Sequence, residues 1–403
     1  MDVEFEFKEK NGGACVTKLL APGAVCVVPE SLGGLPVTEL ADKVFSGSTV
    51  EKVYLPRTLT RIGRYEFYGC EKLQEIHFYG ALREVGGGVF TGCRNIRSLT
   101  VHMGVDEESA LRDFVTEINE RVTVHVFIQD GQNRMQDERD TDSARTSLAS
   151  STFEEENGET ETARVIFPEY YEDSVENTPA RIVSIETHGC GHRYRYCFAG
   201  RVFQYRGYDE LFPHVQVQEQ EELVTELALG RLMYPRELSE KFREHYLDYV
   251  REHWETAGKL LIQADRLQRN RVSNLEPGKL PWLVDEVLDA AHQDAAAGYG
   301  QNMSGADEAV KEPGEPENTN QISANLADQL GRLTSLAQEA GDTEMVSWLM
   351  ERRHRLRTAA QNVGGVEQTA DAARSTDRSQ FASDNPEISS EPQRPKRKRR
   401  FEL

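Results

Sequence analysis

Apolar positions in the first quarter of the chain recur with a period of 22 and then 23 residues. Phe45, Phe67 and Phe90 mark this period, and a glycine follows each of them two positions later. Self-similarity at this spacing is typical of a solenoid, in which a repeat buries its apolar face only by stacking on its neighbours. The pattern therefore predicts three stacked coils over residues 37–103.

Each copy contains a short segment in which apolar and polar residues alternate. In the first copy Val53 and Leu55 alternate with Lys52 and Tyr54, and a period of two predicts a strand with one buried face. We expect one such strand per repeat, stacked on the next. The outward face would then carry two aligned rows of polar residues as a recognition surface. These rows are Lys52, Glu75 and Ser98, and Tyr54, His77 and Thr100.

The repeats resemble the BspA-like leucine-rich repeats, whose pattern is close to V-x-x-I-G-x-x-A-F-x-x-C-x-x-L-x-x-I-x-L-P. The resemblance starts with a lead-in from Val16 and covers residues 16–103. It implies a leucine-rich repeat solenoid, and many proteins of this kind are exported. We expect residues 16–28 to cover the first coil and residues 106–128 to cover the last. The matching residues are Ile62, Gly63, Phe67, Cys70, Leu73, Ile76 and Phe78, then Phe90, Cys93, Ile96, Leu99 and Val101.

The pattern changes after the repeats. An amphipathic helix is predicted over residues 106–119, followed by strands over 122–128 and 163–171. The polar and acidic stretch 130–162 between the strands is predicted to be disordered, and the strands that flank it are expected to pair. The phrase FPEYYEDSVENTPARI resembles the C-terminal regions of uncharacterised clostridial-type leucine-rich repeat proteins.

From Tyr208 onward the apolar residues follow a helical period. Helices are predicted over 219–232, from Pro235 at the first helical position to Trp254, over 256–269 and over 281–297, and then as a pair over 326–340 and 343–355. The pair resembles the helices of an ankyrin repeat. The matching residues are Leu336, Ala337, Gly341, Glu344, Val346, Leu349 and Met350.

The fold class that follows is multidomain α+β, in which a short leucine-rich repeat solenoid precedes a mainly α-helical domain. Disordered inserts and a disordered tail complete the chain. The expected division is 1–36 N-terminal cap and lead-in repeat, 37–103 leucine-rich repeats, 104–129 C-cap helix and strand, 130–162 disordered acidic insert, 163–207 β-rich connector, 208–297 helical domain, 298–322 disordered linker, 323–357 ankyrin-like helix pair, and 358–403 disordered tail with a basic end.

Charge limits the choice of partner. The chain of 403 residues has a formal net charge of −21, which disfavours non-specific binding to nucleic acid or to an anionic membrane. The bases at 394–400 are predicted to form a solvated tail attracted to the protein's own acidic surface. A nuclear signal, or a handle for RNA or for an acidic partner, is the alternative.

Location follows from the same features. The sequence contains no run of 18 apolar residues, so no membrane span is expected. Its N-terminus carries acids at positions 2, 4 and 6 without an apolar core, which is not a secretory signal. Six cysteines in a chain of this length agree with a reducing compartment. A cytoplasmic location is therefore expected.

Candidate chemistry is sparse. Phosphate-binding, nucleophile-elbow, zinc-protease and dinucleotide-binding motifs are all missing from the sequence, so we expect neither an enzyme nor a cofactor. We favour a scaffold or adaptor that binds a protein partner through its repeats. One alternative is a surface adhesin of the BspA-like type. The other is a metal-dependent protein. The spacing of its ligands is not that of a zinc knuckle, however. A glycine turn beside a strand over 193–205 explains this segment better. The ligands of the metal-dependent protein would be His188, Cys190, His192 and Cys197.

Overall fold

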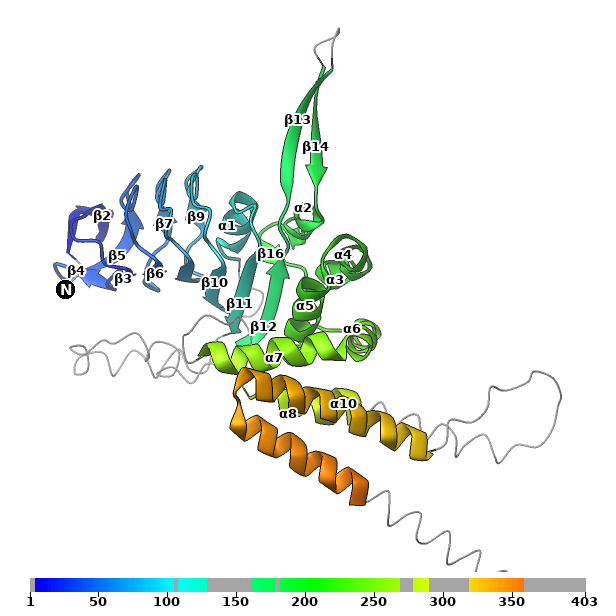
Figure 1. The fold of residues 1–403 in the computed structure, drawn as a ribbon. Helices are drawn as coiled ribbons and strands as arrows, with labels where there is room; N and C mark the ends of the chain where they lie inside the picture. Colours follow the sequence, from blue (N-terminus) through cyan, green and yellow to red (C-terminus); the bar gives the residue numbers. More distant parts are fainter. Residues whose placement is uncertain are drawn as a thin grey trace, which may run out of the picture.

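The computed structural model describes residues 4–104, 108–128, 161–177, 182–268, 278–289 and 319–358. The first part of the chain is a β-solenoid, and the part that follows is mainly helical (Figure 1). The segments predicted to be disordered, 130–162, 298–322 and 358–403, lie outside the described residues apart from their ends. No helix in the described ranges combines the length and the apolar character that crossing a bilayer requires.

Two sheets run along the solenoid, and each coil contributes a strand to both. Sheet A has the order β1-β2-β5-β7-β9, with β4 beside β5, and sheet B has the order β12-β11-β10-β8-β6-β3. Sheet A contains β1 (Phe5–Lys10), β2 (Gly13–Leu19), β4 (Ser31–Leu32), β5 (Leu35–Leu40), β7 (Arg61–Ile62) and β9 (Glu84–Val85). Sheet B contains β3 (Val25–Val27), β6 (Lys52–Tyr54), β8 (Glu75–Tyr79), β10 (Ser98–Met103), β11 (Val122–Ile128) and β12 (Glu161–Phe167).

Phenylalanine rings form the centre of the solenoid core. Phe45, Phe67 and Phe90, which mark the repeat, stack in order with ring centroids 5.2 and 5.7 Å apart. Phe114, in helix α1 (Leu111–Glu117), continues the column with its centroid 5.1 Å from that of Phe90. All four side chains are at most 3% exposed. The column therefore joins the repeats to the element that closes them.

Cysteines occupy the turn that follows Phe67 and Phe90, where the first repeat has Ser48. The Cys70 thiol donates a hydrogen bond to the Phe45 carbonyl of the preceding coil, and the Cys93 thiol donates to the Phe67 carbonyl, with distances of 3.0 and 2.9 Å. Both side chains are buried. The repeat therefore uses a small thiol as a coil-to-coil link and not as a reactive group.

Backbone hydrogen bonds also connect the coils. The amide of Phe45 donates to the carbonyl of Glu66, and the amide of Phe67 donates to that of Val89. The third coil has no fourth copy above it, and α1 stands in its place. The Glu117 carboxylate accepts the amide of Gly88 at 2.8 Å and that of Phe90 at 3.2 Å. One side chain thus replaces the carbonyls that a further repeat would supply.

Sheet B continues past the repeats. Strand β11 runs parallel to β10, and β12 runs antiparallel to β11, which confirms the expected pairing of the two strands that flank the insert. An isolated bridge then links Ala163 of β12 to Pro235. The prediction that Pro235 begins a helix is wrong, because this bridge holds it in extended backbone and the next helix begins only after Ser239.

The predicted strand over 163–171 is in fact two strands. It ends at Phe167, and Pro168 separates it from β13 (Tyr171–Asn177). Strands β13 and β14 (Ile182–His188) form a hairpin that projects from the body of the molecule (Figure 1).

The strand predicted over 193–205 is wrong as well. The chain forms a turn of helix, α2 (Gly191–Tyr194), and a short hairpin of β15 (Phe198–Ala199) and β16 (Val202–Phe203). Gly191 lies so close to the Pro168 carbonyl that a Cβ there would be 2.0 Å from that oxygen. The buried Arg195 then donates hydrogen bonds to five backbone carbonyls around it. These contacts select a compact turn where the alternation of residue types had suggested a strand.

The remaining elements are mainly helices, and α5 packs beside β12. Helix α10 packs on α7, where a Cβ on Gly258 would lie 2.2 Å from the Leu333 side chain. The helix predicted over 281–297 is described only to residue 289, and most of that part is a π-helix. The elements are α3 (Tyr205–Asp209), α4 (Phe212–Gln218), α5 (Glu221–Met233), α6 (Glu240–Glu252), α7 (Trp254–Gln268), α8 (Leu280–Trp282), the π-helix η2 (Leu283–Asp289), α10 (Thr319–Ala340) and a helix over 343–358.

One carboxyl group lies inside the repeat core. Glu66 is 0% exposed and occupies the position where the repeat pattern has alanine. Its Oε2 accepts the amide of Val44 at 3.2 Å, whereas no described group bonds to its Oε1. Burial raises the pKa of Glu66 well above its usual range. Burial therefore favours the neutral acid over the carboxylate in the folded protein, since a buried carboxylate without a cation is costly.

Removal of the Glu117 carboxylate should destabilise the solenoid. Glu117→Ala leaves the amides of Gly88 and Phe90 without acceptors, so we expect a loss of about 1–3 kcal/mol in the free energy of unfolding. Glu117→Gln keeps one acceptor and should lose less. In denaturant unfolding, the free energy of unfolding should decrease in the order wild type, Glu117→Gln, Glu117→Ala. Equal stability of wild type and the Ala variant would contradict the role of this carboxylate.

Glu66 should make the fold less stable as the pH rises. Its folded-state pKa is higher than its unfolded one, so the folded chain binds the extra proton, and stability falls above the usual carboxyl pKa of about 4.5. Glu66→Gln should therefore be more stable than wild type at pH 7.5 and similar to it near pH 4.5. Thermal unfolding at both values tests this, with the exposed Glu71→Gln as control. A difference that does not change with pH would contradict a buried neutral acid.

Candidate functional site

The outward face of sheet B carries all six side chains that the sequence suggested for recognition. In the register of the sheet, Lys52 lies opposite Glu75, and Glu75 lies opposite Ser98. Tyr54, His77 and Thr100 align in the same way, two residues further along their strands. The two rows therefore run side by side across β6, β8 and β10, perpendicular to the strands.

The first row is partly exposed, and two of its three members are charged. The Lys52 Nζ lies 2.7 Å from a Glu75 carboxylate oxygen, and the two side chains are 28% and 26% exposed. Burial alone would raise the pKa of Glu75, but hydrogen bonds from His77 and Lys52 outweigh it and lower the pKa. Glu75 thus stays ionised, and the pair presents one positive and one negative group on the surface.

The second row is buried, which corrects the expectation of a solvated polar column. Tyr54, His77 and Thr100 are only 9%, 8% and 4% exposed. The Tyr54 ring stacks on the His77 ring at a centroid distance of 4.2 Å and an interplanar angle of 18°. Aromatic and imidazole rings at neighbouring strand positions cover one another in this way. Truncation of either ring would therefore lower the stability of the fold as well as remove a side chain from the face.

A third row was missed by the sequence analysis. Tyr79 stacks on His102 with ring centroids 5.0 Å apart, and His102 stacks on Phe127 at 4.9 Å. The Arg57 guanidinium lies 5.3 Å from the centroid of Tyr79. The signal was present, because Tyr79 and His102 follow His77 and Thr100 by two residues on the same strands.

The second row continues from Thr100 to His125 on β11 and ends on β12 in a buried ion-pair network. His125 lies opposite Arg164 in the register of β11 and β12. Glu161 Oε1 is 3.0 Å from His125 Nδ1 and 2.8 Å from Arg164 Nε. Burial alone would raise the pKa of Glu161, but the charges of His125 and Arg164 outweigh it and lower the pKa to about 2. Arg164 also lies over the Tyr234 ring, 4.4 Å from its centroid, which ties this end of the sheet to the helices.

The structure does not assemble the residues of the metal alternative. His188 stacks on Tyr171 of the opposite strand at 4.7 Å, and the Cys190 thiol donates to a Glu219 carboxylate oxygen at 3.1 Å. The Cys197 thiol points to the carbonyl of Arg193, and His192 packs between the rings of Tyr170 and Tyr196. Within the described ranges no group of three or more His, Cys, Asp or Glu side chains is placed to hold a metal ion.

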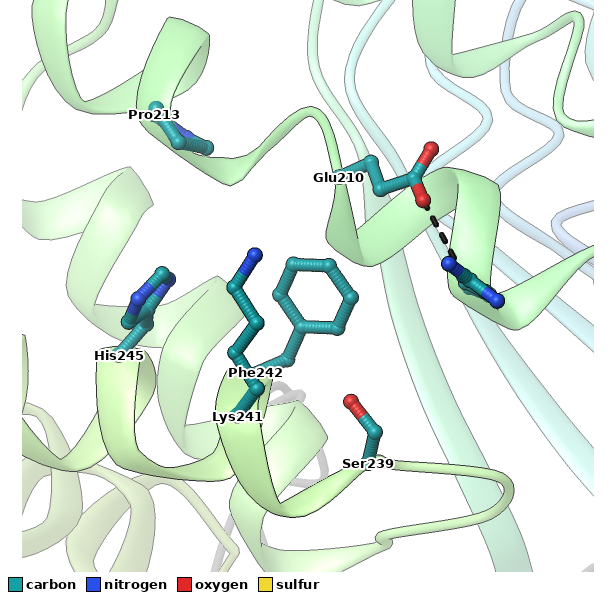
Figure 2. Close-up of a pocket in the computed structure, with 7 residues that line it drawn as sticks. Glu210, Pro213, Ser239, Lys241, Phe242 and His245 are labelled. Carbon is teal, nitrogen blue, oxygen red and sulfur yellow. Dashed lines mark hydrogen bonds and ion pairs between the residues drawn. The ribbon is translucent and has the colours of Figure 1, made fainter.

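A surface hollow lies between the start of α6 and the helices α3 and α4 (Figure 2). Its volume is about 570 Å³, and Phe242 supplies a buried wall. Arg206 is paired with Glu210, with an Nε to Oε1 distance of 3.2 Å, and the other polar side chains are exposed. We assign it no chemistry. The lining residues are Arg206, Glu210, Pro213, Ser239, Lys241, Phe242 and His245.

The Glu161 network should support the fold above mildly acidic pH. Its folded-state pKa is lowered to about 2, so its stabilising contribution is complete above the unfolded pKa of about 4.5 and is lost as the pH falls toward 2. Glu161→Gln should cost up to roughly 3 kcal/mol at pH 7 and much less at pH 3. Chemical unfolding at both values measures this, with the exposed Glu84→Gln as control. A cost that stays constant with pH would contradict the ionic account.

Comparison with known proteins gives the solenoid a family. Residues 38–110 match the model of the BspA type leucine rich repeat region, whereas no curated protein matches the chain. Solved structures also resemble it, including the following two. A leucine rich repeat protein of T. pallidum is 22% identical over 27% of this chain and 73% of its own, with a TM-score of 0.19. A leucine rich cell surface protein of Faecalibacterium prausnitzii is 21% identical over 30% of this chain and 35% of its own, with a TM-score of 0.23. The part of this chain that is similar to BspA-type leucine-rich repeats is residues 38–110, on the match to the family model alone.

Proposed function

We propose that the protein is a non-enzymatic scaffold or adaptor that binds a protein partner on the outward face of sheet B. The observation that carries this proposal is the register of the sheet, which gathers Lys52, Glu75 and Ser98 into one partly exposed row beside the stacked rings. Leucine-rich repeat proteins are a class that binds other proteins and does not generally catalyse, and this supports the assignment.

The packing of the face suits binding in a second respect. The rings of Tyr54 and His77 are held by their stack, and those of Tyr79, His102 and Phe127 by theirs. A surface whose side chains are already ordered loses little conformational entropy when a partner binds. The pair Lys52–Glu75 adds two opposite charges at a fixed place, which favours a partner with a complementary pair and sets its orientation.

A double charge reversal tests the proposal. Lys52→Glu combined with Glu75→Lys keeps an ion pair within the sheet but exchanges the two charges that a partner meets. The matched control is Arg61→Glu with Glu84→Arg, a pair on sheet A whose side chains are 51% and 74% exposed. Affinity capture from a lysate of the source organism, read by mass spectrometry, should show at least a roughly tenfold loss of a partner for the first variant only.

Two outcomes of the capture would contradict the proposal. If both double variants retain every partner that the wild type captures, the face of sheet B is not the binding surface. If both double variants lose the same partner, the loss comes from rearranging surface charge anywhere on the solenoid and not from the face of sheet B. Thermal unfolding of each variant shows that the fold is intact before capture is compared.

We propose that the protein is cytoplasmic, because all six cysteines are free thiols, which agrees with a reducing compartment. The adhesin alternative requires the chain on the cell surface. Cell fractionation with detection of the native chain separates the two, since recovery in the cell-surface fraction would favour adhesion.

A further inference from the structure

The N-terminal end of the solenoid presents an open strand edge. Strand β1 is the last strand in the order of sheet A and pairs only with β2 among the described strands. Glu6, Phe7, Lys8 and Glu9 are exposed, and the Phe7 side chain is 38% exposed although its ring lies over Gly33. An edge of this kind is a template for another strand unless its sequence prevents pairing.

The sequence of β1 complements itself. If two copies of Glu4-Phe-Glu-Phe-Lys-Glu-Lys10 lie antiparallel with Phe7 at the centre, Glu4 faces Lys10 and Glu6 faces Lys8 on each side of the axis. Opposite charges at directly facing positions stabilise a strand pair, whereas like charges destabilise it. Charges that serve only to block an edge need not alternate in this order. The four cross-pairs arise because Glu4 and Glu6 precede Phe7, whereas Lys8 and Lys10 follow it on the same face of the strand. Glu9 lies on the other face and would be opposite Phe5 of the second copy.

The backbone has the same symmetry. The amide of Leu20 in the neighbouring chain segment donates to the carbonyl of Glu4, so Glu4 directs its backbone toward β2. The extra residue of the bulge between β1 and β2, Thr17, lies on β2, so the alternation continues along β1. Phe5, Phe7 and Glu9 therefore direct their N–H and C=O groups to the open edge. These are the residues that form hydrogen-bonded pairs in an antiparallel pairing centred on Phe7.

We infer that β1 pairs with β1 of a second copy, so that sheet A continues across a two-fold axis. The contact is isologous, because the same patch serves both copies and closes the assembly at two. The helices lie at the other end of the solenoid from β1 and do not obstruct this contact (Figure 1). Lys10 already contacts Glu39, but an ammonium group has three donors and also accommodates Glu4 of the second copy.

The mass of the full chain in solution tests the dimer. Sedimentation equilibrium should show twice the chain mass of 45.6 kDa at high concentration. The Glu6→Lys and Lys8→Glu variants each place like charges at both inner pairs, so each should raise the dissociation constant of the dimer at least about tenfold. A mixture of the two variants restores opposite charges at both pairs and should form a heterodimer.

The mixture distinguishes pairing of β1 from any other association. Thermal unfolding confirms that both variants are folded, and a Lys72→Glu variant, at an exposed lysine in the repeats, controls for the change of net charge. The inference is overturned if the wild type is a monomer at about 100 µM, or if both variants remain dimers. It is also overturned if the two variants, each monomeric alone, stay monomeric when mixed.

Discussion

Hydrogen bonds between successive coils hold the solenoid together, and they make its two ends the critical places. Inside the stack, each coil donates backbone hydrogen bonds to both of its neighbours and accepts hydrogen bonds from both. An end coil has donors or acceptors without a neighbour, and a buried amide without an acceptor costs about as much as the hydrogen bond it fails to make. The sequence around the repeats is best understood as a set of solutions to this constraint.

At the C-terminal end the solution has three layers. In the first layer, Glu117 accepts hydrogen bonds from backbone amides of the last coil that have no further repeat to bond to. In the second, β11 and β12 extend sheet B, and in the third, α5 packs beside β12. Arg195 then fastens the layers. Its guanidinium donates to the carbonyls of Ile118 and Glu120 at 2.7 and 2.8 Å, beyond the end of α1, and to that of Gly191 at 2.9 Å in α2. Burial lowers its pKa to about 10, which leaves it charged at neutral pH. The solenoid and the helices thus share one core.

The sequence alone was sufficient where residues repeat. The period predicted the phenylalanine column and the alignment of Lys52 with Glu75, because both follow from stacking identical coils. The sequence was insufficient where a residue makes a contact that does not recur in the other repeats. Glu117 looks like any surface acid of a helix, and Glu66 looks like a tolerated substitution of alanine. The helical turn at Gly191 depends on Pro168 and on Arg195, whose partners are distant in sequence. Burial of Tyr54 and His77 was missed because a polar residue on a strand was assumed to face water.

The pairing of β11 with β12 has a consequence for how the chain tolerates change. Phe127 and Glu161 face each other on adjacent strands. The chain between them therefore leaves β11 and enters β12 at the same end of this strand pair. The entropy of closing such a loop grows only with the logarithm of its length. Residues can therefore be added or removed there without shifting the register of either strand. This edge is where a whole foreign domain could be spliced into the protein while the solenoid and the helices keep their shared core.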